Sequence, residues 1–193
     1  MTIVRPESGR EMHQLSFSRT MDAEPVYSVS IVGLGMQGQK TWVQSLINSS
    51  SIVVSAVCDS NDEVVNCFRA RFPTVPAYTS LQELLKNHKS DFAIVCVPNK
   101  HHFSIIQQLE SSGVHCLKEK PIASSPQEFH RLCKSKAKIG VAFQRRWQPR
   151  FKHFRQLLPE VGKPISVRAT LIRQHEVLKD GWRVQHNVGI FVG

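Results

Sequence analysis

The chain has 193 residues, of which 41% are hydrophobic and 21% are charged, so it holds enough apolar material for a folded core and is not disordered for most of its length. The 25 Lys and Arg residues outnumber the 15 Asp and Glu residues, which gives a formal net charge of +10 with histidine neutral. There is no run of about 18 apolar residues, which excludes a membrane-spanning helix.

Targeting and cellular compartment are indicated by the N-terminal segment and by the cysteines. Residues 1–25 mix basic with acidic side chains and contain no apolar segment, so we expect a poorly ordered tail and no secretory signal or presequence. The five cysteines are an odd number without a C-x-x-C pair, which argues against a disulfide framework and a zinc ribbon. No group of potential ligands has metal spacing, so we expect no metal. A reducing compartment, the cytoplasm, is the simpler expectation.

From residue 28 to residue 143, short apolar runs alternate with longer amphipathic stretches. Such alternation predicts an α/β fold in which a doubly wound, Rossmann-type parallel sheet has helices on both faces. The predicted strands are 28–33, 52–59, 76–78, 92–97, 115–118 and 138–143. The predicted helices are 37–47, 62–71, 81–87, 101–111 and 126–135.

The pattern changes after residue 143. A helix is predicted over 150–158, a turn over 162–164, and a half-exposed strand over 165–173, where apolar and polar residues alternate. We therefore predict a domain boundary, with a nucleotide-binding domain at 26–144 and the start of an α+β substrate domain at 145–193. This last segment holds 10 basic and 3 acidic side chains.

A glycine motif follows the first predicted strand and opens the first predicted helix. Gly33, Gly35 and Gly38 form G-x-G-x-x-G, which permits a tight turn, a close approach to a pyrophosphate and close helix packing. Asp59 lies 21 residues after Gly38, near the spacing at which a carboxylate meets the ribose hydroxyls and repels a 2′-phosphate. The sequence thus favours NAD over NADP. The alternative is a glycine-rich turn with Asp59 as a helix cap.

Two further strand ends carry polar loops. Strand 92–97 runs into Pro98 and Asn99, and strand 115–118 runs into Glu119-Lys120-Pro121. Both loops lie at carboxyl ends of parallel strands, where open α/β sheets bind ligands. With the glycines, Asp59 and the histidines 101 and 102, they resemble the Gfo/Idh/MocA family, the glucose-fructose oxidoreductases and inositol dehydrogenases. The resemblance covers residues 28–193, and its most specific part is Glu-Lys-Pro.

The resemblance implies roles for individual residues. Lys120 matches the family's catalytic lysine, which contacts the reacting hydroxyl, and Glu119 matches a residue on the cofactor side. Pro121 matches a proline that often follows a cis peptide bond. The alternative is that Lys118, Glu119 and Lys120 form a solvated charge run. The predicted NAD-binding residues are Gly33, Leu34, Gly35, Met36, Gln37, Gly38, Asp59, Ser60, Val97, Pro98, Asn99, His102, Glu119, Lys120, Pro121 and Gln144.

The remaining histidines and cysteines have simpler explanations. Either His101 or His102 contacts the cofactor or caps a helix, and His115 is a core or edge residue. The three strand cysteines are expected to be small buried hydrophobic residues; they are Cys58, Cys96 and Cys116.

The segment 188–193 resembles the start of the family's Gly-Gly-x-x-x-Asp-x-x-x-His element, which brings the acid/base histidine. Val188 stands in place of a glycine, Gly193 falls where the aspartate is expected, and the sequence stops before the histidine. We therefore expect a truncated second domain, weak NAD binding and little dehydrogenase activity. The implied substrate is a sugar or polyol, as in inositol dehydrogenases, and the family's homo-oligomer is doubtful for this chain.

Two other function classes stay open. A non-catalytic NAD(P) sensor or interaction protein would share every cofactor residue and need no histidine. An anion or nucleic-acid binder would use the basic residues, but these span a domain junction and no nucleic-acid motif accompanies them. They are Arg145, Arg146, Arg150, Lys152, Arg155, Lys163, Arg168 and Arg173.

Overall fold

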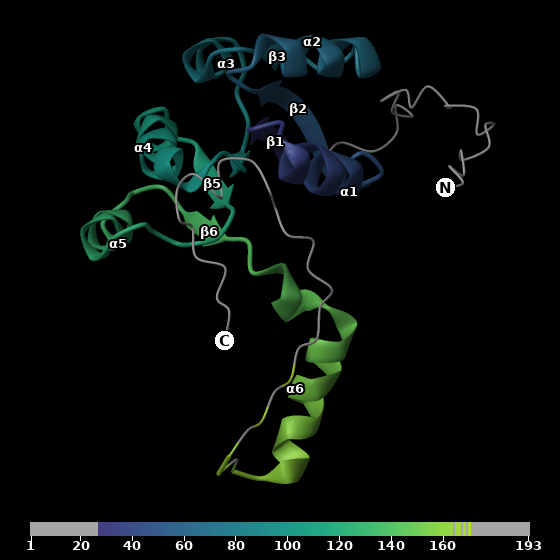
Figure 1. Cartoon of the computed structure of the whole chain (residues 1–193), viewed down its shortest axis with the longest axis vertical. Coiled ribbons are helices and arrows are strands. Elements are labelled where there is room, and N and C mark those ends of the chain that lie inside the picture. The colour runs from purple at the N-terminus through teal and green to yellow at the C-terminus, as the bar shows by residue number, and fades with distance from the viewer. Residues whose placement is uncertain (1–26, 164, 167, 169, 171–193) are drawn as a thin grey trace, which may run out of the picture. The chain divides into compact units, whose positions relative to one another are not determined.

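The structure is a computed structural model that describes residues 27–163, 165, 166, 168 and 170 (Figure 1). The chain divides into two compact units, Met1–Ala142 and Phe143–Gly193. The predicted tail 1–25 and the segment 188–193 lie outside the described residues, and the predicted strand 165–173 lies largely outside them.

The first unit is built on a six-stranded sheet with the order β3-β2-β1-β4-β5-β6, and every pair of neighbours is parallel. The strands are β1 (Tyr27–Val32), β2 (Ile52–Cys58), β3 (Ala77–Tyr78), β4 (Phe92–Val95), β5 (His115–Lys118) and β6 (Ile139–Val141). The predicted doubly wound parallel sheet is confirmed. Winding reverses between β1 and β4, and this is where such sheets form their ligand crevice.

Helices cover the sheet on both sides (Figure 1). The first unit contains η1 (Gln37–Val43), α1 (Gln44–Leu46), α2 (Asp62–Arg71), α3 (Leu81–Asn87), η2 (Asn99–His101), α4 (His102–Ser111) and α5 (Pro126–Cys133). The helix predicted over 37–47 is therefore a π-helical segment, η1, followed by one short α-helical turn.

Two hydrophobic clusters, one on each face of the sheet, form the core. Alternation along β1 sends Val29 and Ile31 to the first cluster and Val32 to the second. The first cluster also includes residues of η1 and α2, such as Val43 and Phe68, and the second includes residues of α3 and α4. Burying one such side chain stabilises the fold by about 1.5–3 kcal/mol. The sheet is thus packed between two helical layers, and its carboxyl edge is left for loops.

Local signals in the sequence explain where several helices begin and end. The side-chain oxygen of Asn61 accepts hydrogen bonds from the backbone N–H groups of Glu63 and Val64 and so caps α2. Ser80 and Ser125 cap α3 and α5 in the same way. The backbone turns at Gly113, with a φ of 72°, just after α4.

The second unit contains η3 (Gln144–Trp147) and α6 (Pro149–Val161), which extends the helix predicted over 150–158 at both ends. Gly162 ends α6 with a positive φ, as a helix-terminating glycine does. No helix among the described residues of either unit is long and apolar enough to cross a membrane.

Candidate functional site

Gly33 forms the tight turn after β1. Its φ is 98°, a conformation that L side chains rarely adopt. A Cβ atom here would lie 2.8 Å from the carbonyl carbon of Cys96, at the end of β4. Two independent constraints therefore require glycine at this position: the backbone angle and the close approach of the neighbouring strand.

The other two glycines of the motif have different roles. A Cβ on Gly38 would overlap the carbonyl oxygen of Gly33, so this glycine lets the helix pack against the turn. Gly35 is exposed, and a Cβ there would meet no protein atom within 4 Å. The space above Gly35 is thus open for a ligand to approach the backbone, which is the role that the motif predicts for its second glycine.

Asp59 lies at the end of β2 and is joined to the glycine turn. Its Oδ2 accepts a hydrogen bond of 2.6 Å from the backbone N–H of Leu34, and its Oδ1 accepts one of 2.9 Å from that of Asn61. The cap of α2 is Asn61, so the alternative in which Asp59 serves as the helix cap does not describe this structure. Each carboxylate oxygen accepts one of these bonds and keeps a second lone pair for further donors. The next residue, Ser60, is exposed.

The loop after β4 is held in place by a hydrogen bond from His102. This side chain is 3% exposed, and its Nε2–H donates a 2.8 Å hydrogen bond to the carbonyl oxygen of Val97. Burial, and secondly the charge of Lys118, lower the pKa of His102 to about 4, so the imidazole is neutral at pH 7. Its Nδ1 is buried and has no hydrogen-bond partner among the described residues. His102 therefore holds the loop that carries Pro98 and Asn99 and does not itself open to solvent, whereas His101 is exposed.

Glu119 connects the end of β5 to the first helix. Its Oε1 accepts hydrogen bonds of 3.0 Å from Nε2 of Gln37 and from Nε1 of Trp42. Gln37 was predicted at this site from the sequence, but the bond to Trp42 was not. Since both donors lie on η1, Glu119 spans the sheet from β5 to the helix that follows β1.

Lys118 is the feature that the sequence reasoning missed. The side chain is 1% exposed, and its Nζ donates 2.7 Å hydrogen bonds to the carbonyl oxygens of Pro121 and Ile122. With Lys118 buried and Glu119 bonded to η1, the charged residues at the end of β5 do not form a solvated run. The alternation of side chains along the strand could have predicted this burial, because Lys118 lies two residues after Cys116 and therefore on the same, buried side of β5.

Lys120, the predicted catalytic residue, contrasts with both neighbours. It is exposed, and its ammonium forms no hydrogen bond with another described residue. The peptide bond between Lys120 and Pro121 is cis, as the family resemblance implies. Gln144, the last predicted cofactor residue, belongs to the second unit and is exposed there.

Backbone hydrogen bonds bring the other predicted residues to one edge of the sheet. The N–H of Gly33 donates to Cys58, that of Cys96 to Val32, and that of Glu119 to Val95, at 2.8–2.9 Å. The glycine turn, Asp59, the loop after β4 and the loop after β5 thus share the carboxyl edge around the switch between β1 and β4. An open glycine turn with a carboxylate beside it fits a dinucleotide.

The thiols near this edge have no reactive character. Cys58 and Cys116 are buried and Cys96 is half-buried, which confirms the interpretation of these residues as small hydrophobic ones. Burial raises the pKa of Cys58 and of Cys116 to about 11 and raises that of Cys96 further. Among the described residues, no group of three or more His, Cys, Asp or Glu side chains could hold a metal ion.

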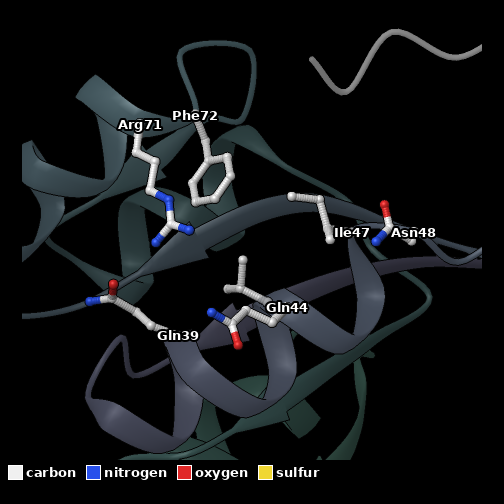
Figure 2. Close-up of a pocket in the computed structure, with 7 residues that line it drawn as sticks. Gln39, Gln44, Ile47, Asn48, Arg71 and Phe72 are labelled. Atoms are coloured by element: carbon white, nitrogen blue, oxygen red, sulfur yellow. The ribbon is translucent and has the colours of Figure 1, made fainter. Parts of the chain in front are cut away.

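A separate pocket of about 240 Å³ lies on the face covered by η1, α1 and α2. Figure 2 shows Arg71 and Phe72, at the end of α2, facing the helix that carries Gln39 and Gln44. The pocket is lined by Gln39, Val43, Gln44, Ile47, Asn48, Arg71 and Phe72. None of these residues was predicted from the sequence to bind the cofactor.

The comparisons with known proteins agree with this geometry. A family described as an oxidoreductase family with an NAD-binding Rossmann fold, GFO_IDH_MocA, matches residues 27–146. A D-glucoside 3-dehydrogenase of Escherichia coli strain K12 is 26% identical over 165 residues, which cover 82% of this chain and 46% of that protein.

Solved structures show the same fold. A WlbA dehydrogenase of Bordetella pertussis, in complex with NADH and UDP-GlcNAcA, matches 71% of this chain and 42% of its own with a TM-score of 0.62 and 18% identity. The apo scyllo-inositol dehydrogenase of Lactobacillus casei matches 72% of this chain and 43% of its own with a TM-score of 0.64 and 16% identity. The chain thus spans less than half the length of each of these relatives.

Proposed function

This chain belongs to the Gfo/Idh/MocA oxidoreductase family, and we propose that residues 26–144 bind NAD in preference to NADP for hydride transfer to or from a sugar or polyol. Residues 145–193 would begin the substrate domain. The substrate class rests on the relatives, which include a D-glucoside 3-dehydrogenase and a scyllo-inositol dehydrogenase.

The observation that carries the cofactor proposal is the position of Asp59. Its carboxylate is fixed to the backbone N–H of Leu34, in the middle of the glycine motif, so it lies next to the turn that would hold the pyrophosphate. A carboxylate in this place accepts hydrogen bonds from ribose hydroxyls. It would repel a 2′-phosphate, because no cation among the described residues forms an ion pair with Asp59.

Different residues at this edge of the sheet would bind the cofactor and orient the substrate. When bound, NAD supplies the acceptor for a hydride. The turn 33–38 and the start of η1 would hold the pyrophosphate through backbone N–H groups. The exposed ammonium of Lys120 would orient the substrate and polarise its oxygen, since an ammonium can donate to an alcohol or a carbonyl.

Titration of the 193-residue chain with NAD and NADP tests the cofactor proposal. Asp59→Ala should weaken NAD binding about tenfold, a loss of about 1.4 kcal/mol, and reduce the preference over NADP. Lys120→Ala should change NAD affinity less than Asp59→Ala does. Unchanged affinity and preference in Asp59→Ala would overturn the assignment.

Catalysis needs its own measurement, because a non-catalytic NAD sensor would give the same binding results. Hydride transfer predicts NADH formation by the 193-residue chain from a sugar or inositol panel, slow because the chain spans less than half the length of its relatives, and loss of this activity in Lys120→Ala. NAD binding without turnover of any such substrate would favour the sensor.

The cysteines support a reducing compartment, and we propose the cytoplasm. All five lie among the described residues and are free thiols, two of them in strands of the sheet. Small folds that depend on disulfides are typical of oxidising compartments.

A further inference from the structure

Lys118 is a buried lysine for which the proposed chemistry has no use. It lies at the end of β5, is 1% exposed, and directs both of its 2.7 Å hydrogen bonds at backbone carbonyls of Pro121 and Ile122. Lysines are almost never fully buried unless they are paired. No described carboxylate forms an ion pair with this ammonium, so the two carbonyl oxygens are its direct partners.

The surroundings make the charged form of Lys118 costly. Burial lowers the pKa of Lys118 to about 8, although the thiol of Cys116 on β5 and the carboxylate of Glu128 on α5 act in the opposite direction. From α4, the neighbouring His102 is neutral at pH 7 and offers no negative charge. A buried ammonium that weakens the fold in this way is expected where another property depends on it.

The conformation of the loop that follows Lys118 depends on the hydrogen bonds of its ammonium. Glu119 accepts hydrogen bonds from Gln37 and Trp42, and the backbone carbonyls of residues 121 and 122 accept hydrogen bonds from Lys118. Lys120 lies between these two attachments, exposed and without a hydrogen bond of its own to the described residues. The backbone of Lys120 is therefore fixed on both sides while its side chain stays available.

We propose that Lys118 is a positioning residue: its ammonium holds the Glu119–Ile122 loop in the conformation that presents Lys120 to bound NAD and substrate. The proposal rests on the NAD site proposed above. Hydrogen bonds from an ionised donor are about twice as strong as those between neutral groups, so the charged lysine holds the two carbonyls more firmly than a neutral side chain would.

The first test requires no cofactor. Amide hydrogen exchange of the 193-residue chain is compared between wild type, Lys118→Met, and Lys134→Met as a matched control on the exposed cap of α5. Lys118→Met should speed exchange about tenfold at Glu119, whose N–H donates a hydrogen bond to Val95, whereas exchange in β1 and β2 and in the control stays as in wild type. Unchanged exchange in this loop would overturn the proposal.

The second test measures NAD affinity as a function of pH. At pH 7, Lys118→Met should weaken NAD binding about threefold relative to wild type and to Lys134→Met, an effect no larger than that of Lys120→Ala. In wild type, the affinity should fall as the pH rises through about 8, because the neutral amine is a weaker donor, and this step should be absent in Lys118→Met.

The wild-type pH profile keeps the test valid even if Lys118→Met fails to fold. If wild type binds no NAD, the proposed function fails. If wild type binds NAD with no step near pH 8, or if Lys118→Met binds NAD as tightly as wild type, the positioning role alone fails.

Discussion

The two halves of the candidate site are built by different means. The glycine turn after β1 owes its shape to backbone sterics, because Gly33 has a φ of 98° and lies against the backbone of Cys96. The loop after β5 owes its shape to side chains, because Glu119 and Lys118 attach it to η1 and to its own carbonyls. Backbone sterics are insensitive to pH, whereas side-chain attachments made by charged groups depend on ionisation.

The largest expected effect is a loss of stability when the glycine turn after β1 is altered. Gly33→Ala forces an unfavourable φ and a contact with Cys96, and should lower the free energy of unfolding by about 3–5 kcal/mol in urea denaturation. Gly113→Ala is the matched control: φ is 72° there, but a Cβ would meet nothing within 4 Å. Its loss should be roughly 1–2 kcal/mol. Equal losses in the two variants would show that the approach to Cys96 has no energetic importance.

This difference in construction also explains what the sequence could predict. The strands, the glycine turn and Asp59 were predictable because apolar periodicity and glycine spacing express local constraints. The bonds from Gln37 and Trp42 to Glu119 join residues 82 and 77 positions apart, and no local pattern encodes them. Lys118 was missed because its charge suggested solvent, although its register in β5 placed it inside.

The next effect concerns pH and the loop after β4. In the folded chain the pKa of His102 is about 4, below its ordinary 6.5, so the unfolded chain binds an extra proton between these values. The stability contribution of neutral His102 is therefore present above pH 6.5 and lost as the pH falls to 4. Relative to His102→Gln, wild type should lose roughly 3 kcal/mol over this range.

Urea denaturation at pH 4 to 7 checks this expectation. His153→Gln, on the exposed surface of α6, is the control and should keep the pH dependence of wild type. If His102→Gln loses as much stability as wild type between pH 7 and pH 4, the loop after β4 does not depend on a neutral imidazole.

A smaller effect tests the side-chain attachment of Glu119. Trp42→Phe keeps an aromatic ring but removes one of the two donors to Oε1, so we expect a loss of about 1.5–3 kcal/mol in unfolding free energy and weaker NAD binding. Trp147→Phe is the matched control, since Trp147 is 68% exposed in the second unit. A Trp42→Phe variant as stable as Trp147→Phe would mean that the bond from Trp42 contributes little to the attachment of Glu119.

The smallest effect separates stability from binding at the end of β2. Asn61→Ala removes the side-chain cap of α2 and should cost about 1 kcal/mol. It keeps the backbone N–H of Asn61 that donates to Asp59, so the carboxylate stays in place and NAD affinity should not change. Asp59→Ala should lower NAD affinity instead. Parallel urea denaturation and NAD titration of the two variants measure both properties, and a fall in NAD affinity in Asn61→Ala would mean that the cap of α2, not the backbone bond, holds Asp59 in position.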